Sequence, residues 1–332
     1  MTTIPCRKKR FKENLESILN QTYNFDKFVI VMQSNFSKED FQFFEEIATV
    51  DPRIELLIGD VKWRSCNKLL PTLEKYPDDI IITIDDDTYY PPRSIETLVE
   101  EYRKNPDCII CHQSSWVEVD ETNKHIEIKN ISISELRFGQ KTFDRYLSNC
   151  CLFPPGAFNN TDLFNFCRMF QCVKGTHDEW WFWVNSTMNS VQSICVDYVK
   201  SMCSIRKTPF GKDEPQLCVI NTVKRQKLYN DNISKIYFDK LWSAIQSKPT
   251  TFIINSKNEG AFKKRLKYIK QYYRYNDIKV IYEETGDEEI IKPEPIKLKK
   301  QKTSSDFFLK LLKYSIYKSN QSILLKRKVG FR

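Results

Sequence analysis

The fold of this chain is decided by the stretch Ile80-Ile81-Ile82-Thr83-Ile84-Asp85-Asp86-Asp87. Its first part is a short apolar run of the kind found in strands that are buried on both faces of a parallel sheet. Three carboxylates follow at once. Because open α/β sheets bind ligands at the carboxyl ends of their strands, we expect the three Asp residues to lie where a ligand would sit.

Segments that pattern as strands and as helices alternate on both sides of this stretch. The strand-like runs before it are residues 2–4, 28–32 and 53–58, and apolar residues at helical spacing occupy 11–19, 41–48, 67–75 and 94–104. Such alternation predicts an α/β fold with a doubly wound, mostly parallel sheet that carries helices on both faces.

The pattern changes after Cys111. Two strand-like runs flank residues 121–124 and predict a hairpin, and Pro154-Pro155-Gly156 marks a turn. Helical spacing returns at residues 162–170, 179–188 and 239–245. A separate strand, helix and strand pattern over residues 250–282 predicts a small C-terminal extension.

The net charge of +9 is concentrated at the C-terminal end of the chain. Residues 290–332 hold 12 Lys/Arg and 2 Asp/Glu, which leaves the rest of the chain close to neutral. A nucleic-acid-binding protein would spread its Lys and Arg over a folded face, so this distribution argues against a nucleic-acid partner. Ser305-Asp306 and the apolar residues after it predict a capped amphipathic helix, which suits either an anionic membrane surface or packing on a protein surface.

The 11 Cys residues favour a reduced, cytoplasmic setting. Their number is odd, and no apolar leader separates Met1 from the basic residues after Cys6. Cys108 and Cys111 lie in an apolar run without a second ligand pair, so we interpret them as buried structural cysteines and not as a zinc site. No run reaches the roughly 20 apolar residues that span a bilayer, so any membrane contact is expected to be peripheral.

Asp85, Asp86 and Asp87 repel one another unless a cation binds them. Mn²⁺ and Mg²⁺ prefer oxygen ligands and are commonly held by one or two carboxylates together with substrate phosphates. Such a cation acts as a Lewis acid on a departing diphosphate. The alternative is a solvated acidic turn whose Asp residues cap the helix that begins at Ser94.

A second candidate centre is His177-Asp178-Glu179, which precedes Trp180, Trp181, Phe182 and Trp183. Aromatic rings stack on the C–H faces of sugars, and a carboxylate in apolar surroundings can accept a hydroxyl proton near neutral pH because its pKa is raised. The alternative is a helix N-terminus whose acids favour the helix dipole and whose tryptophans are core. The residues alone leave both interpretations open.

Six motifs of the chain follow one another in a characteristic order. They are Thr2-Thr3-Ile4-Pro5-Cys6-Arg7, residues 15–22, Lys68 before Leu69 and Leu70, residues 80–90, Pro154-Pro155-Gly156 and Asp178-Glu179-Trp180-Trp181. In this order the chain resembles bacterial glycosyltransferases of the GT-A fold, family 2-like, from about Thr2 to Ile245. The resemblance implies a nucleotide-sugar donor, with a UDP-sugar favoured, and a Mn²⁺ or Mg²⁺ ion.

The resemblance also implies roles for single residues on the donor side. Asp85 and Asp87 match the Asp-x-Asp motif, in which Asp87 would bind the metal and Asp85 would face the ribose or base and share the metal. The remaining donor-binding candidates match the nucleotide loop, the basic residue near the diphosphate and the middle of the acidic motif, and they are Thr3, Pro5, Arg7, Lys68 and Asp86.

On the acceptor side, Glu179 matches the general base of inverting relatives, with Asp178 beside it. This pair reads Asp-Glu where many relatives read Asp-Asp or Glu-Asp, which leaves the base open between the two neighbours. His177 is a candidate third metal ligand or a loop residue. The candidates for contact with the acceptor are Gly156, Trp180 and Trp181. A further departure from the family is the short first strand.

The expected organisation is a GT-A domain over residues 1–248, a small α/β extension over 249–290 and a basic amphipathic tail over 291–332. Within the domain, residues 1–112 would be the nucleotide-binding half and 113–248 the acceptor half.

The expected function is hexosyl transfer from a nucleotide-diphosphate sugar to a hydroxyl of a glycan or lipid-linked acceptor, as in polysaccharide biosynthesis, in the cytoplasm or peripherally at the cytoplasmic membrane face. One alternative is a nucleotidyltransferase, although no glycine precedes Gly59 to build a phosphate loop. The other is a non-catalytic carbohydrate-binding or scaffold module.

Overall fold

The structure is a computed structural model of the chain. It describes residues 1–129, 140–143, 145–196, 223–254, 256, 259–260, 262–263, 266 and 277–292. The chain divides into two compact units, Met1–Pro293 and Glu294–Arg332, and all described residues belong to the first. The tail expected over residues 291–332 therefore lies outside the described residues from position 293 onward.

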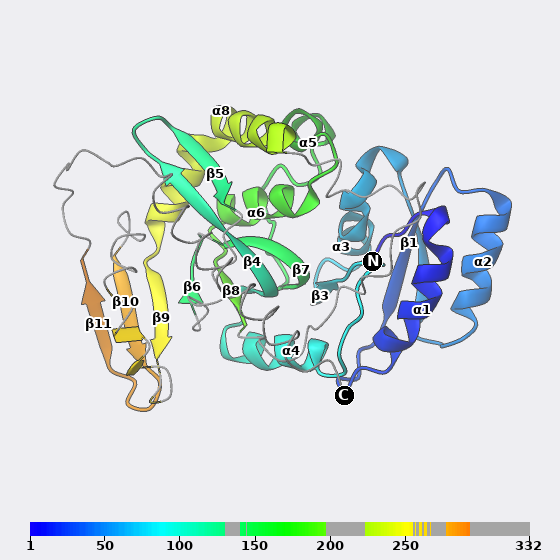
Figure 1. Ribbon diagram of the computed structural model, residues 1–332, viewed down its shortest axis with the longest axis horizontal. Coiled ribbons are helices and arrows are strands. Elements are labelled where there is room, and N and C mark those ends of the chain that lie inside the picture. Colours follow the sequence, from blue (N-terminus) through cyan, green and yellow to red (C-terminus); the bar gives the residue numbers. More distant parts are fainter. Residues whose placement is uncertain are drawn as a thin grey trace, which may run out of the picture. The chain divides into compact units, whose positions relative to one another are not determined.

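The N-terminal part of the first unit is a pair of parallel strands with helices beside it (Figure 1). Its elements are η1 (Pro5–Arg7), α1 (Lys8–Leu19), β1 (Phe28–Gln33), α2 (Lys38–Ala48), β2 (Ile54–Gly59), η2 (Val61–Lys68) and α3 (Leu70–Lys75). Ser37 begins α2 in a capping box with Asp40. Thr2 adds one parallel bridge to Val31 of β1. The expected alternation of helices and strands is confirmed from Lys8 onward, whereas residues 2–4, expected as a strand, contribute only this isolated bridge.

A five-stranded sheet holds the middle of the unit. Its strands are β3 (Ile81–Thr83), β4 (Ile109–Asp120), β5 (His125–Lys129), β7 (Arg145–Phe153) and β8 (Ser193–Cys195), and the helices near it are α4 (Ser94–Lys104), α5 (Phe166–Val173), α6 (Asp178–Met188) and α8 (Val223–Ser247). The order is β3-β7-β4-β5, and β8 pairs with β4. The hairpin around residues 121–124 is confirmed, because Asp120 pairs with His125.

Strand pairing in this sheet is mixed, whereas the sequence pattern predicted mostly parallel pairing. β7 lies antiparallel between β3 and β4, and β5 is antiparallel to β4, while β8 is parallel to β4. A short hairpin connection can join only antiparallel strands, so the β4–β5 pair follows from its four-residue turn. The fold is α/β with mixed sheets and helices on both faces.

Strand β4 separates two apolar cores. Ile109 and Cys111 face the core that contains the tryptophans of α6, and Ile110 faces the core that contains Leu98 of α4. Figure 1 shows α6 and α4 on opposite sides of this sheet. The side chains of Cys108 and Cys111 are buried at 0% exposure, as expected for residues of a core strand.

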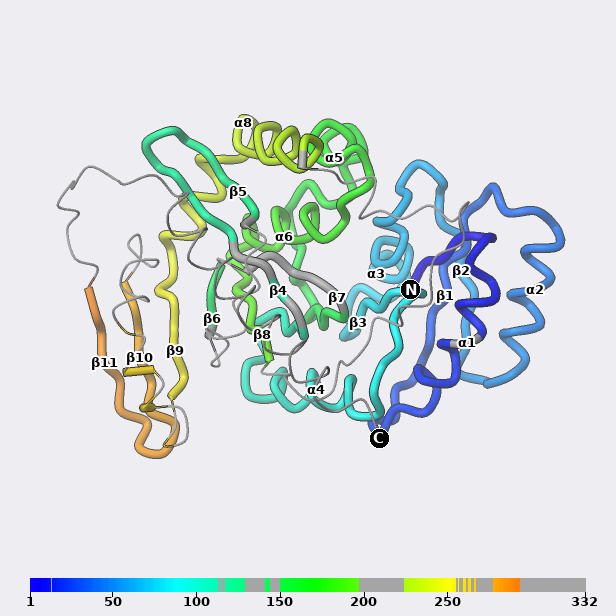
Figure 2. Tube along the Cα trace, in the orientation of Figure 1, coloured from blue at the N-terminus to red at the C-terminus, as the bar shows by residue number. Residues whose placement is uncertain are grey.

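A third sheet closes the described part of the chain. It has the order β11-β10-β9-β6, and its strands are β6 (Gln140–Lys141), β9 (Thr250–Ile254), β10 (Ile278–Tyr282) and β11 (Glu288–Ile291). Figure 2 shows β9, β10 and β11 side by side. The helix expected between β9 and β10 falls largely outside the described residues.

The edges of β1 and β3 are not hydrogen-bonded to each other in the described part of the chain. A cavity of about 510 Å³ lies beside them, with Met1, Val29, Ile82 and Ile84 among its lining residues. None of the helices over the described ranges has both the length and the apolar character needed to cross a bilayer.

Candidate active site

The acidic motif follows β3, and its three carboxylates differ in burial. Asp86 is buried at 5% exposure, whereas Asp85 and Asp87 are half-buried. Thr88 and Tyr90 are also buried. The chain makes a turn at Asp86 and Asp87, and this turn encloses the Asp86 side chain while Asp85 and Asp87 stay partly open.

The N-terminal segment of the chain holds the Asp86 side chain in place. The Thr3 hydroxyl donates to one carboxylate oxygen at 2.6 Å and the Arg7 guanidinium to the other at 2.6 Å. Arg7 also reaches Asp87 at 3.2 Å. Pro5 begins η1, which turns the chain so that Arg7 points at the acidic motif. Thr3 and Asp86 were expected to contact the donor, but both side chains are buried against each other, so they anchor the motif instead.

Helix α1 supplies anchors that the sequence reasoning missed. Asn14 donates to the Asp86 carbonyl at 3.0 Å, and Gln21, just past the helix, donates to the carbonyls of Tyr90 and Pro91 at 3.2 and 2.9 Å. The backbone N–H of Asp85 donates to the Tyr90 hydroxyl at 2.8 Å. The sequence did contain a signal for Asn14, because this polar residue lies on the face of α1 that carries the buried apolar residues of the helix.

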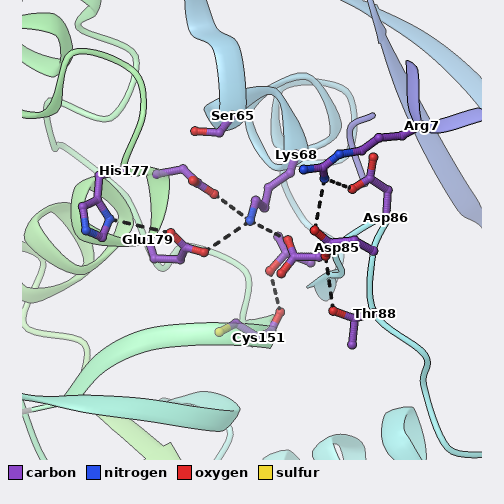
Figure 3. A network of polar contacts seen from close by, with 12 residues as sticks. Arg7, Ser65, Lys68, Asp85, Asp86, Thr88, Cys151, His177 and Glu179 are labelled. Atoms are coloured by element: carbon purple, nitrogen blue, oxygen red, sulfur yellow. Dashed lines mark hydrogen bonds and ion pairs between the residues drawn. The ribbon is translucent and has the colours of Figure 1, made fainter. Parts of the chain in front are cut away.

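Lys68 joins the acidic motif to the acidic pair that begins α6. Its ammonium lies 2.8 Å from Asp85, 2.8 Å from Asp178 and 3.5 Å from Glu179, and the residue is only 9% exposed (Figure 3). The two centres that the sequence placed far apart along the chain therefore form one site, and a buried cation connects them.

The surroundings of these carboxylates move their pKa values apart. Burial and the neighbouring charge of Glu179 raise the pKa of Asp178 to about 6, against the opposing effect of Lys68. Burial would also raise the pKa of Glu179, but the Lys68 ammonium and His177 hold it below its usual range. Burial raises the pKa of Asp87 to about 6, with Asp85 and Asp86 adding to the effect.

The acidic pair differs in accessibility. The Asp178 side chain is 1% exposed, and the Glu179 side chain is 26% exposed. His177 lies beside Glu179, with Nδ1 at 3.8 Å from a carboxylate oxygen and Nε2 at 2.8 Å from Gln226 of α8. Gln226 in turn donates to Asn230. Nothing in the sequence pointed to Gln226, because its contact with His177 depends on how α8 packs.

The candidate acceptor residues take other places in the structure. Trp180 and Trp181 are both 0% exposed, and the Trp181 indole N–H donates to the Leu163 carbonyl at 3.0 Å. Gly156 accepts from Asn189 at 2.8 Å. Asn189 follows the C-terminal end of α6, roughly 15 Å along the helix from its acidic end at 1.5 Å per residue. The acceptor roles of Trp180 and Trp181 are wrong, since both rings form part of the core. The acceptor role of Gly156, which is half-buried, stays a prediction.

The open carboxylates fit a hard divalent cation that shares its coordination with phosphate. Among the residues that the structure describes, no three His, Cys, Asp or Glu side chains gather closely enough to hold a metal alone, and His177 does not join Asp85 and Asp87 in such a group. Two carboxylates are nevertheless the number that Mg²⁺ or Mn²⁺ commonly takes from a protein when substrate phosphates complete its shell. Burial and the charges of Asp85 and Asp86 raise the pKa of Asp87, and a bound cation would act in the opposite direction.

The chain is similar to known proteins in sequence and in structure. Residues 4–165, just under half of the chain, match the family described as Glycosyl transferase family 2. The glucosyl-dolichyl phosphate glucuronosyltransferase of Haloferax volcanii is 32% identical over 103 residues, which are 31% of this chain and 32% of that protein. The chain thus matches about a third of the length of this curated relative.

Among solved structures, a mannosyltransferase from Pyrobaculum calidifontis in complex with GDP-Man and Mn²⁺ is similar at 13% identity and a TM-score of 0.41. That similarity covers 80% of this chain and 73% of the other. The family match, in contrast, includes Arg7, Lys68 and all three Asp residues of the acidic motif, and it ends before the acidic pair of α6. Residues 4–165 are therefore the part of the chain that is similar to Glycosyl transferase family 2.

Proposed function

We propose that this protein transfers a sugar from a nucleotide-diphosphate sugar to a hydroxyl of a glycan or lipid-linked acceptor, with inversion at the anomeric carbon. The observation that carries the proposal is the contact of Lys68 with both Asp85 and the acidic pair of α6. A leaving diphosphate and an attacking hydroxyl must lie on opposite sides of one sugar carbon. One compact site with a donor side and an acceptor side meets that requirement.

On the donor side, Asp85 and Asp87 would hold Mn²⁺ or Mg²⁺ together with the diphosphate. The bound cation supplies Lewis-acid stabilisation of the departing diphosphate. Lys68 adds a second positive charge beside Asp85, where negative charge builds up on the leaving group. Arg7 keeps Asp86 and Asp87 in place through its two contacts.

On the acceptor side, Glu179 is the better general base. Its side chain is partly open, whereas Asp178 is enclosed and cannot reach a hydroxyl outside the core. Lys68 and the nearby His177 lower the pKa of Glu179, so its carboxylate is ionised but is a weaker base than one with a raised pKa. The assignment therefore rests on its accessibility and not on its pKa. Asp178 then acts as a positioning residue that holds Lys68 between the two sides of the site.

The acceptor class draws support from the similar protein of Haloferax volcanii, whose name specifies a glucosyl-dolichyl phosphate acceptor. By analogy with that name we propose a lipid-linked glycan as acceptor. The proposal of a UDP-sugar as donor rests only on the resemblance of the sequence motifs. Such an acceptor would place the protein at the cytoplasmic membrane face, with the C-terminal tail as a candidate contact.

Thermal unfolding with UDP, GDP and CMP, each with and without Mn²⁺, tests the donor side. A nucleotide at a hundred times its dissociation constant stabilises the folded state by roughly 2.7 kcal/mol. We expect one nucleotide to raise Tm only with metal, and Asp87→Asn to abolish the rise. Lys104→Ala, an exposed change on α4, should leave it intact. A well-folded protein that responds to no nucleotide would favour a non-catalytic module.

NMR of the product made from the matching nucleotide sugar tests the stereochemistry. If the anomeric configuration of the product is opposite to that of the donor, the result supports inversion with Glu179 as base. Retention of configuration would contradict that role. Glu179→Gln should lower kcat by at least about a hundredfold, within the range of general base catalysis, and leave the nucleotide-dependent rise in Tm unchanged.

A further inference from the structure

A ladder of aromatic rings lies on the surface beside the site. Trp63 of η2 meets Phe166 of α5 edge to face at 5.6 Å between ring centroids, and Phe166 lies 5.8 Å from Phe170. Phe170 is 40% exposed, and Trp63 and Phe166 are partly exposed. Exposed aromatic rings of this kind mark contact sites more often than isolated exposed aliphatic residues do.

Basic side chains lie over these rings. The Lys62 ammonium is 5.9 Å from the Trp63 ring and 5.8 Å from the Phe166 ring, and the Lys174 ammonium is 4.8 Å from the Phe170 ring. Lys62 also pairs with Asp60 at 2.8 Å on the exposed surface. The aromatic–basic ledge, as we name it, consists of Lys62, Trp63, Arg64, Phe166, Phe170 and Lys174, and it carries a net positive charge even with Asp60 included.

The ledge is tied to the proposed active site through two short chain segments. Arg64 donates to the Lys174 carbonyl at 3.2 Å, and Ser65 donates to the Gly175 carbonyl at 3.2 Å. Three residues after Ser65 comes Lys68, and two residues after Gly175 comes His177, which stands next to the acidic pair. Figure 3 shows Ser65 on the same side of the site as Lys68 and His177.

The backbone at this junction is strained. Arg64 has φ 49° and ψ −121°, a conformation that a side-chain-bearing residue adopts at a cost of roughly 1–3 kcal/mol. Gly175 has φ +69°, and a Cβ there would lie 3.1 Å from the Arg64 side chain. Since Arg64 is exposed, burial of its own side chain does not offset this strain. In this conformation the Arg64 guanidinium contacts the Lys174 carbonyl at the edge of the ledge.

We propose that the ledge binds the acceptor, and that the acceptor carries a phosphate next to an apolar chain. This inference rests on the proposed function and narrows its acceptor class. Ammonium groups already lie over the ring faces, so a stacked sugar would displace them, whereas a phosphate oxygen adds a partner to them. An apolar chain covers Phe166 and Phe170. With its hydroxyl at Glu179, the acceptor would extend outward so that its phosphate and its apolar chain lie on the ledge.

Binding of farnesyl phosphate below its micelle concentration, measured by calorimetry, tests the ledge without requiring turnover. Farnesol and inorganic phosphate are the two partial ligands. We expect farnesyl phosphate to bind more tightly than either, Lys62→Ala/Lys174→Ala to weaken it at least tenfold, and Phe170→Ala to weaken it severalfold. All three positions are at least partly exposed, so the variants should fold. Lys104→Ala and Val50→Ala are matched exposed controls.

Equal binding by the ledge variants and the native protein would overturn the proposal. So would affinity for inorganic phosphate or farnesol that matches that of farnesyl phosphate, or binding to anionic vesicles alone. Asp87→Asn separates the two proposals, because it should bind farnesyl phosphate normally. If the ledge variants lose farnesyl phosphate but no nucleotide binds the native protein, the ledge stands and the sugar-transfer proposal falls.

Discussion

Lys68→Met removes the cation that Asp85, Asp178 and Glu179 share, and it keeps a side chain of similar length. Asp178 is then left as a buried carboxylate without its 2.8 Å partner. Breaking a buried ion pair from one side typically destabilises a protein by about 3–5 kcal/mol, unless the remaining group changes its protonation state. Asp178 can do so, because its pKa already lies at about 6 with Lys68 present.

The pH dependence follows from the sign of this shift. A carboxyl group with a raised folded pKa favours the folded state while it is protonated, and this contribution is lost as pH rises through the folded pKa. In the native protein that loss is complete slightly above pH 6. Without Lys68 we expect the folded pKa of Asp178 to rise further, because burial and the charge of Glu179 then act without the opposing ammonium. Each pH unit above about 6 over which Asp178 stays protonated in the folded variant then destabilises the variant alone by about 1.4 kcal/mol.

Urea unfolding of metal-free protein, followed by tryptophan fluorescence at pH 6 and pH 8, measures this difference. Lys75→Met is the control, since Lys75 is 48% exposed and its surface pair with Glu55 should contribute no more than about 1 kcal/mol. The double variant Lys68→Met/Asp178→Asn should lose the extra pH dependence. An equal loss of stability at both pH values would refute the reasoning, because it would show that Asp178 does not depend on Lys68.

Three further outcomes are expected. Asp87→Asn should stabilise the metal-free protein at pH 7.5 by up to about 3 kcal/mol and have little effect at pH 4. The reason is that the native pKa of Asp87 is raised from 3.8 to about 6, so the ionised form is disfavoured in the folded state. Thermal unfolding at both pH values measures this effect, and a variant that is destabilised at pH 7.5 contradicts it. Trp181→Ala should destabilise the folded protein by about 3–5 kcal/mol, because it leaves a cavity in the core. Trp181→Phe should leave the KM for the acceptor unchanged. A raised KM in steady-state assays would support contact between Trp181 and the acceptor. Among the described cysteines, mass spectrometry after brief alkylation should find Cys6 and Cys167 modified first, since both are exposed. Cys108 should react slowly, because burial raises the pKa of its thiol to about 12. Early labelling of Cys108 would contradict its place in a buried strand.

Much of the fold was predictable because its signals are local. The helix over Ser94–Lys104 and the strand over Ile278–Tyr282 have the expected bounds, since apolar spacing depends only on neighbours in the sequence. The mixed pairing of the central sheet was not predictable in this way. β7 inserts between β3 and β4, and no local pattern records which strand an edge will accept.

The same division holds at the site. Asp85, Asp87 and Glu179 were singled out from residue type and position, and the structure brings them together. Trp180 and Trp181 were misassigned, because an aromatic residue has the same sequence signal in a core and in a sugar site. Thr3 and Asp86 were expected to face a ligand, and only their mutual hydrogen bond shows that they anchor the motif.

By itself the sequence determined the α/β class, the strand that ends in carboxylates and the second acidic pair, because periodicity and residue chemistry are properties of short segments. Only the tertiary structure decided that Lys68 lies between the two acidic centres, that Asp178 is enclosed while Glu179 is partly open, and that Trp63 meets Phe166 edge to face. Those facts depend on contacts between residues about 17 to 111 positions apart, and such contacts arise from packing, which joins whichever apolar faces fit together.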